Sequence, residues 1–362
     1  MAVEQRPPRR RVSQADVAKA AGVSPTIVSS VINNKSYGSI RIGDLTRQRV
    51  LDAVRELGYV PDPVARRMTG HTNRLIGVFT YESVFPMRAH SFYHEFLVGI
   101  EQAAEEADHD LLLVTGSRRE RQPSLYARGS NGLRLADGGL LFGSAENTDE
   151  VVRLTKEGFP FVVVGERNYP GIEASYAAAD YRRGTAALVH RAHELGHRRI
   201  AFAQSYDDPV PGRLAGFLQA KADLAMSADD APVLDLRTAD PWAEPEVQGV
   251  RAARAIVNSG ATCVLLQGGF WLDEFWAEAS RLGVSLPHDL SIILLRSEER
   301  SVDGWPVTEL DIPRNEMGRE AVRILLQLID DPTLGPLRRR LPCGVREGAT
   351  LMSGPRQVPA ST

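Results

Sequence analysis

Apolar and polar positions follow a helical period in the first sixty residues. The positions that would face a core are Val17, Ala18 and Ala21 in one stretch and Val28, Val31 and Ile32 in the next. Ser13 precedes the first stretch as a helix cap and Gly22 ends it. Ser24 precedes the second stretch, with Pro25 at its first position. Two short amphipathic helices separated by so short a break predict a helix-turn-helix.

The outward side of the second helix carries small side chains. These residues are Pro25, Thr26, Ser29, Ser30 and Asn33. Small polar groups can approach base edges in a DNA groove more closely than long or apolar ones. The pattern therefore favours this helix as the element that reads DNA.

A third amphipathic helix is predicted over residues 44–57. Its inward positions are Val50, Leu51, Val54 and Leu57. Further on, Asp62, Pro63 and Gly70 mark the cap, the first turn and the end of a very short helix. A helix of under two turns is marginal in water, so we expect this segment to fold only when it docks on a partner.

From Leu75 onward the pattern changes to short apolar runs that alternate with amphipathic helices. Apolar runs begin at residues 75, 111, 139 and 161, and the alternation restarts at residues 200, 264 and 292. Strands that alternate with helices predict parallel sheets. Two such sets predict two doubly wound lobes, with space for a ligand beyond the carboxyl ends of their strands.

Composition and charge separate the head of the chain from its body. The 362 residues are 43% apolar and 25% charged, which is ordinary for a globular protein of two or three domains. Residues 1–74 hold 13 Lys/Arg against 6 Asp/Glu, a net charge of +7, and the remainder holds 30 against 40, a net charge of −10. A basic head on an acidic body indicates a polyanion as the partner of the head.

No apolar run reaches the roughly 18–20 residues that span a bilayer, and the basic N-terminus lacks the apolar core of a secretory signal. We therefore expect no membrane partner and a location in the bacterial cytoplasm, at the nucleoid when DNA is bound. Cys263 and Cys343 match neither disulfide nor zinc spacing. Their number agrees with a reducing compartment.

Two runs in the head, DVAKAAGVSPTIVSSVINN and LTRQRVLDAVRELGYVPDPVARRM, closely resemble the lactose-repressor (LacI/GalR) family of bacterial transcription regulators. The runs LGHRRIAF, RLAGF and WPVT in the body resemble the effector domain of the same family, which is similar to periplasmic sugar-binding proteins. The resemblance implies an N-terminal all-α helix-turn-helix headpiece with a hinge helix. It also implies a two-lobed α/β periplasmic-binding-protein-like domain with parallel sheets.

The resemblance also implies a division of the chain. The headpiece would cover 1–60, the hinge helix and linker 61–74, the effector-binding and dimerisation domain 75–352, and a disordered tail 353–362. The first lobe would comprise about 75–195 and 314–341, and the second lobe about 196–313 and 342–352.

By resemblance, the headpiece and the hinge bind DNA. The implied DNA-binding residues are Ser13, Pro25, Thr26, Ser29, Ser30, Asn33, Arg41, Ala65 and Met68. Pro25, Thr26 and Ser30 match reading positions in the major groove, and Met68 matches the apolar wedge of the minor groove. Ser30 stands where an arginine is common, which changes the base preference. Arg41, in a loop that is longer than usual, is either an extra phosphate contact or solvated.

The effector pocket departs most from the family. The implied residues are Arg213, Trp242, Phe270, Arg296 and Arg314. Arg296 replaces an aspartate, Arg314 replaces a stacking aromatic, and Gly268-Gly269 replaces Asn-Asp. Because arginine offers only donors, we hypothesise that Arg213, Arg296 and Arg314 converge on an anionic effector. The alternative is a degenerate pocket whose arginines pair with acidic neighbours, in a regulator controlled by a protein partner or by no ligand.

The resemblance implies a homodimeric repressor that binds a pseudopalindromic operator in double-stranded DNA and responds to a small-molecule effector in the cleft between its lobes. A solute-binding protein would share the body, but the basic head opposes that reading. An enzyme would need a catalytic constellation, and none stands out. His190, His193 and His197 have the spacing of metal ligands, but Leu195-Gly196 ends their helix, so we expect neither a metal nor a cofactor.

Overall fold

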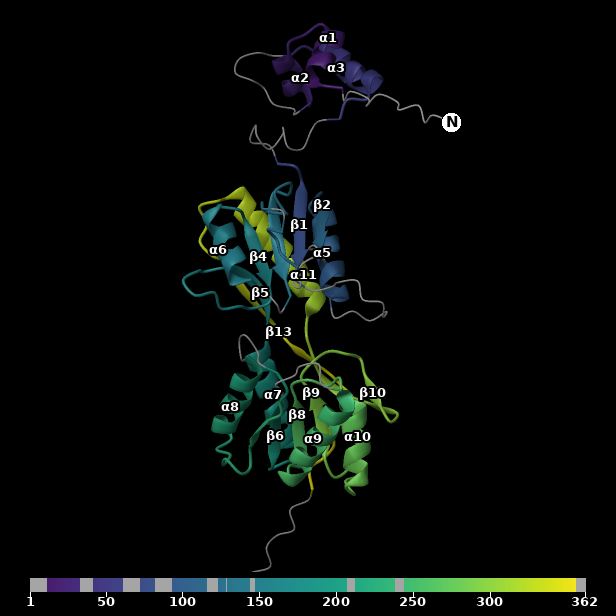
Figure 1. Ribbon diagram of the computed structural model, residues 1–362, viewed down its shortest axis with the longest axis vertical. Helices are drawn as coiled ribbons and strands as arrows, with labels where there is room; N and C mark the ends of the chain where they lie inside the picture. The colour runs from purple at the N-terminus through teal and green to yellow at the C-terminus, as the bar shows by residue number, and fades with distance from the viewer. Residues whose placement is uncertain are drawn as a thin grey trace, which may run out of the picture. The chain divides into compact units, whose positions relative to one another are not determined.

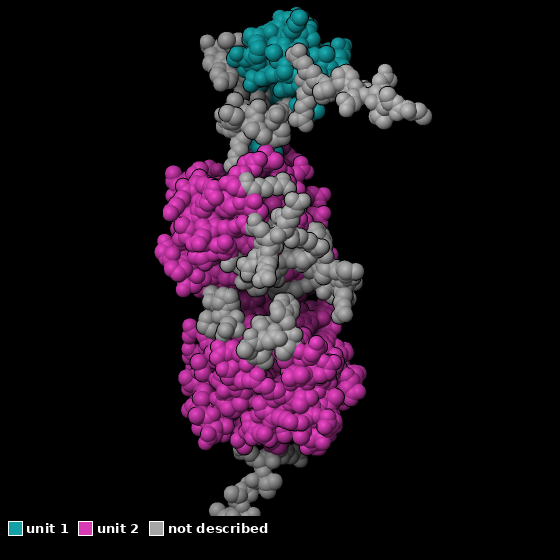
Figure 2. Space-filling model, viewed as in Figure 1, with its two compact units in different colours: residues 1–73 teal, residues 74–362 magenta. Residues whose placement is uncertain are grey.

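The computed structural model describes the chain in nine stretches. They are residues 12–32, 42–60, 72–81, 93–115, 123–127, 129–143, 147–206, 212–237 and 244–355. They belong to two units, Met1–Asn73 and Arg74–Thr362 (Figure 2). The predicted hinge helix over 61–70 and the predicted contacts Asn33, Arg41, Ala65, Met68 and Trp242 lie outside the described residues.

The first unit is a bundle of short helices. They are α1 (Gln14–Ala21), α2 (Pro25–Ile32) and α3 (Asp44–Leu57). Ser13 caps α1 in a reciprocal capping box, in which its Oγ lies 3.3 Å from the Asp16 N and its own N lies 2.8 Å from the Asp16 carboxylate. Gly22 and Gly58 end α1 and α3 with φ of 65° and 61°, a left-handed conformation that favours glycine.

The core of this unit is built from small and branched apolar residues. Its buried members are Val17, Ala18, Ala21, Val28, Val31, Val50 and Ala53. The prediction that Leu51 and Leu57 face inward is wrong, because each is 38% exposed. Val50 and Ala53 hold the core side of α3, and Val54 is only partly buried against it. The inward face of α3 is therefore narrower than the apolar pattern indicated.

The first lobe of the second unit contains a six-stranded parallel sheet in the order β13-β5-β4-β3-β1-β2 (Figure 1). Its strands are β1 (Leu75–Thr80), β2 (Asp110–Thr115), β3 (Gly138–Phe142), β4 (Phe161–Val164), β5 (Ser175–Asp180) and β13 (Arg338–Pro342). One core joins this sheet to α5 (His94–Glu106) and α11 (Arg314–Asp330). A second core on the other face joins it to α6 (Thr148–Lys156) and to buried residues of the turns after β2.

Helices α5 and α11 touch through backbone. A Cβ added to Gly99 of α5 would lie 2.0 Å from the carbonyl oxygen of Asn315. A Cβ added to Gly318 of α11 would lie 2.4 Å from the carbonyl oxygen of Phe96. Glycine at both positions therefore permits the close approach that brings the N-termini of the two helices together.

The second lobe contains a six-stranded sheet in the order β14-β12-β9-β8-β6-β7, parallel except for the antiparallel edge strand β14. Its strands are β6 (Ile200–Gln204), β7 (Val233–Asp235), β8 (Cys263–Leu266), β9 (Ser291–Leu294), β12 (Thr308–Asp311) and β14 (Gly344–Arg346). Helices α7 (Tyr181–Glu194) and α8 (Gly212–Asp223) share one core with this sheet. Helices α9 (Pro245–Asn258) and α10 (Leu272–Arg281) share the other, next to the hairpin β10 (Ser301–Val302) and β11 (Trp305–Pro306).

The chain passes between the lobes three times, from β5 to α7, from β12 to α11, and from β13 to β14. The predicted end of the first lobe near residue 195 is wrong. Leu188 and Val189 of α7 are buried in the core of the second sheet, so the first crossing precedes α7. Tyr181 and Cys343 touch the cores of both lobes. Among the described residues, no helix is both long and apolar enough to cross a membrane.

Candidate nucleic-acid interface and effector site

The face of α2 that points away from the core carries short side chains. Pro25 and Thr26 are exposed and Ser29 is half-buried, whereas Val28 and Val31 are buried against the other helices. The packing of α2 against α1 and α3 thus leaves a narrow surface of small groups outside. Such a surface can enter a groove without a steric barrier.

Ser30 does not belong to this outward surface. Its side chain is 4% exposed, and its Oγ donates a hydrogen bond of 3.0 Å to the carbonyl oxygen of Thr26. The prediction that Ser30 faces outward is wrong, because a serine is short enough to fold back onto its own helix. The hydroxyl of Ser13 likewise bonds locally, to the carboxylate of Asp16 at 2.7 Å.

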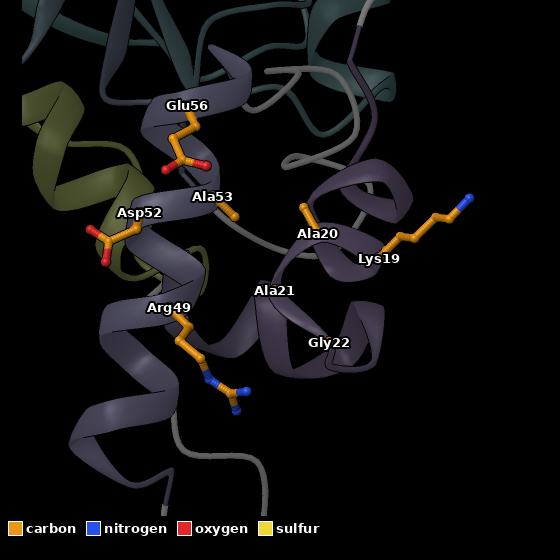
Figure 3. Close-up of a pocket in the computed structure, with 8 residues that line it drawn as sticks. All are labelled: Lys19, Ala20, Ala21, Gly22, Arg49, Asp52, Ala53 and Glu56. Carbon is orange, nitrogen blue, oxygen red and sulfur yellow. The ribbon is translucent and has the colours of Figure 1, made fainter.

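A polar pocket of about 330 Å³ lies between α1 and α3 (Figure 3). Its charged lining residues are Lys19, Arg49, Asp52 and Glu56. Arg55 and Gln48 bond to the carboxylate of Asp52 and lower its pKa below the ordinary value. Because the lining holds both signs of charge and none of Pro25, Thr26 and Ser29, the pocket is separate from the outward surface of α2.

In the second unit, arginines gather where β9 ends. Arg213, in the first turn of α8, donates from Nε to the carbonyl oxygen of Leu295 at 3.0 Å. Its guanidinium lies 3.7 Å from the centre of the Tyr181 ring. Arg314, the first residue of α11, donates to the carbonyl oxygen of Ser297. Arg296 lies between these two carbonyls in sequence, so the structure brings the three predicted arginines to one short segment.

Two of these arginines have carboxylate partners. Arg296 Nε lies 2.8 Å from the carboxylate of Glu298, and Arg314 Nη1 lies 3.2 Å from that of Glu95. Burial lowers the pKa of Arg314; the carboxylate of Glu95 opposes that shift, and the positive charge of Arg296 adds to it. Because Arg314 donates to the carbonyl of Ser297, the residue after Arg296, both arginines stand at the same short segment.

The loop after β9 is held by a buried carboxylate. Glu309 of β12 is fully buried, and its two oxygens accept the backbone N–H groups of Glu298, Glu299 and Arg300 at 2.9, 3.0 and 3.2 Å. Successive N–H groups that converge on one anion form a backbone nest. The conformation of the segment that carries Arg296 and Glu298 thus depends on Glu309.

Comparisons with known proteins agree with both units. The family described as "Bacterial regulatory proteins, lacI family" matches residues 14–62, and the "Periplasmic binding protein-like domain" matches residues 189–351. The HTH-type transcriptional regulator CelR of Thermobifida fusca is 30% identical over 346 residues, which are 91% of this chain and 95% of that protein. The chain belongs to the lacI family of bacterial regulatory proteins.

Other members of the lacI family agree. The HTH-type transcriptional repressor CytR of Escherichia coli is 27% identical over 334 residues, 91% of this chain and 93% of that protein. A solved transcriptional regulator CelR–cellobiose complex is 26% identical with a TM-score of 0.61, covering 94% of this chain and 100% of that one. The lac repressor dimer bound to operator and the anti-inducer ONPF shares the fold, with a TM-score of 0.68 at 21% identity over 95% of this chain and 100% of that one.

These findings confirm the predicted family, the headpiece joined to a two-lobed α/β domain, and the class of DNA-binding transcriptional regulator rather than enzyme. Two of the three arginines of this lacI-family chain, Arg296 and Arg314, pair with the carboxylates of Glu298 and Glu95, as the alternative reading of the sequence expected of all three. Sequence reasoning missed these two carboxylates. It also missed Glu309, because β12 has the sequence TELD and its two carboxylates give no sign that one of them is fully buried.

The turn between β8 and α10 packs closely against the end of β9. A Cβ added to Gly269 would lie 2.7 Å from the Leu294 Cδ1, so glycine fits closely beside the end of β9. Arg300 donates to the Gly269 carbonyl and thereby joins this turn to the loop after β9. Phe270 follows in the same turn and is 50% exposed.

Proposed function

We propose that this lacI-family protein binds a pseudopalindromic operator as a homodimer and releases or tightens its hold when a small ligand binds where the two lobes meet. The DNA-binding part of the proposal rests on the outward surface of α2, which Pro25, Thr26 and Ser29 form. The inward face of α2 is buried in the core of the headpiece, and the side chains of its outward surface are short. Two such heads on a two-fold axis match a pseudopalindrome. The protein would act in the bacterial cytoplasm, where its operators lie.

Several of the predicted DNA contacts belong to residues outside the described stretches, and we propose them as well. Asn33 and Arg41 would touch the DNA backbone, and Ala65 and Met68 would lie in the minor groove on a hinge helix that folds on DNA. Coupled folding of a short helix on its target is a common device in regulators.

Binding of the full chain to genomic fragments tests this proposal. We expect selected fragments to be retained over random duplex, with log affinity falling linearly with log salt. Thr26→Ala removes an exposed group of α2, so we expect roughly tenfold weaker binding to the selected fragment and unchanged binding to random duplex. Thr148→Ala, at the exposed first residue of α6, is the matched control. Equal affinity for every duplex would contradict the proposal.

The edge of the first sheet supports the homodimer. Strand β2 carries the run Leu111–Val114 at the end of the strand order, with Leu111 37% exposed and its neighbours only half-buried. An apolar, unpaired edge strand is usually covered, and we propose that a second copy covers it. Leu111→Glu is expected to shift the sedimenting species toward monomer, whereas Leu334→Glu, at a residue 40% exposed in a turn, leaves it unchanged. Equal sedimentation of both variants would place the interface elsewhere.

The ligand of one relative is known, and the pocket residues of this chain suggest a different class of ligand. The structure of CelR is a complex with cellobiose, and this chain places arginines where the sequence pattern of the family has an aspartate and an aromatic. We propose that the ligand of this chain is anionic and that it lies beyond the carboxyl end of β9.

A further inference from the structure

The ion pair of Arg314 with Glu95 is unequally buried. The Arg314 side chain is 7% exposed, whereas that of Glu95 is 42% exposed. A carboxylate that already faces water can leave its partner at small cost, but a buried guanidinium that loses a paired anion retains a less compensated charge. The pair is therefore built so that its anion, rather than its cation, can be exchanged.

The cation of this pair is held in place by the chain around it. Arg314 donates to the carbonyl oxygen of Ser297, and the hydroxyl of Ser297 donates to the Leu310 carbonyl at 2.9 Å and accepts the Ile312 N–H at 2.7 Å. Arg314 begins α11, which packs in the first lobe, while Ser297 follows β9 of the second lobe. The guanidinium thus occupies a fixed position at the crossing between the lobes.

Arg296 supplies a second cation from the other lobe. Its side chain is 31% exposed and pairs with Glu298, which is 26% exposed, and its charge reaches Arg314. Glu309 fixes the backbone of the loop on which Glu298 stands. Arg314 bonds to the carbonyl of Ser297, the residue after Arg296, so two cations from different lobes stand at one segment, and an oxyanion between them would lower the electrostatic energy of the site.

We propose that a carboxylate or phosphate group of the ligand binds between Arg296 and Arg314 and displaces Glu95, which occupies the site as an internal substitute when the ligand is absent. This inference rests on the proposed ligand site and names its chemistry. Because one arginine belongs to each lobe, the bound anion ties the loop after β9 to the N-terminus of α11. The free energy of that contact sets how far the ligand shifts the equilibrium between the ligand-free and the ligand-bound arrangement of the lobes.

An uncharged polyol is a poorer fit to this pair of arginines. Hydroxyl groups can donate hydrogen bonds to carboxylates and accept them from guanidinium groups. A polyol would therefore donate to Glu95 and Glu298 rather than displace one of them. The two ligand classes therefore predict opposite effects of removing the charge of Glu95.

Titration calorimetry of the full chain tests this with inorganic phosphate, citrate and glucose 6-phosphate as anionic probes and with glucose and cellobiose as neutral ones. We expect at least one anion to bind, with an affinity that falls as salt is added. Glu95→Gln is expected to tighten that binding several-fold, and Arg296→Gln to weaken it roughly tenfold, because one charge-assisted contact is lost. The exposed pair Arg338–Glu173, 3.1 Å apart, supplies the matched controls Arg338→Gln and Glu173→Gln, which leave the affinity unchanged.

Three results would overturn the inference: no binding of any anion, anion binding that Arg296→Gln leaves unchanged, or binding of a neutral sugar that Glu95→Gln weakens. Arg296→Gln is preferred to a substitution of Arg314, whose burial makes loss of folding the expected outcome. Retention of operator fragments by the ligand-free chain is measured in the same variants. It reports on the headpiece, so a failure of the anion site and a failure of DNA binding are told apart.

Discussion

Replacing Glu309 by glutamine keeps the shape of the side chain and removes its charge from the interior of the second lobe. In the native chain one carboxylate oxygen accepts the N–H groups of Glu298 and Glu299, and the other accepts that of Arg300. Hydrogen bonds to a charged group contribute about 1.5–3 kcal/mol each, against about 0.5–1.5 kcal/mol for neutral ones. Glutamine can keep two of these bonds in their neutral form, at a loss of about 1 kcal/mol each. Its amide group would face the third N–H, donor against donor, which costs about 1–3 kcal/mol more.

The Glu309→Gln variant is therefore expected to lose about 3–5 kcal/mol of the free energy of unfolding. Urea unfolding followed by tryptophan fluorescence measures this loss, because Trp271, Trp276 and Trp305 pack in or against the core of the same lobe. Glu173→Gln, at an exposed carboxylate of the first lobe, is the control and is expected to stay within about 0.5 kcal/mol. A loss below about 1 kcal/mol for Glu309→Gln would refute the assignment of the three bonds to a charged acceptor.

Three further changes test separate parts of the molecule. Ser13→Ala removes the cap of α1 and is expected to destabilise the headpiece by about 1 kcal/mol, seen as faster amide exchange in α1 only. Gly99→Ala forces a methyl group against the Asn315 carbonyl; overpacking of this kind costs about 1–3 kcal/mol and lowers Tm, whereas Gly335→Ala, in open space, does not. Burial lowers the pKa of His197, so the unfolded chain takes up the proton first, and the contribution of His197 to stability is lost as pH falls below about 6.5. Urea midpoints at pH 7.5 and 5.5 check this, and His197→Gln is expected to reduce the difference between them.

The helices α1, α2 and α3 of the headpiece could be predicted from the sequence, because the signals that start and end them are local. Ser13 and Gly22 mark the ends of α1 by their own side-chain and backbone chemistry, and both do so in the structure. Ser30 shows the limit of the method. The helical period predicts an outward side chain at this position, but a short hydroxyl can instead donate to a carbonyl of its own helix, as Ser30 does to Thr26. The packing around the helix decides between the two.

The arginine site could be predicted only in part. The resemblance to the family predicts Arg213, Arg296 and Arg314 as pocket residues, and the structure brings all three to the end of β9. The partner of Arg314 could not be predicted, because Glu95 and Arg314 are far apart in the chain and meet only through the packing of α5 on α11. Pairings of this kind depend on the fold as a whole and leave no periodic trace in the sequence.

The three crossings between the lobes govern the order in which a growing chain can complete its parts. All the described helices of the headpiece precede residue 60. The first lobe, in contrast, is complete only after α11 and its edge strand β13, which ends at Pro342. On the ribosome, the helix-turn-helix can therefore fold before the sheet of the first lobe is complete. A stop codon between residue 60 and β13 would release a chain with a complete head and with neither lobe sealed, so premature termination in that range removes the lobes and leaves the helix-turn-helix.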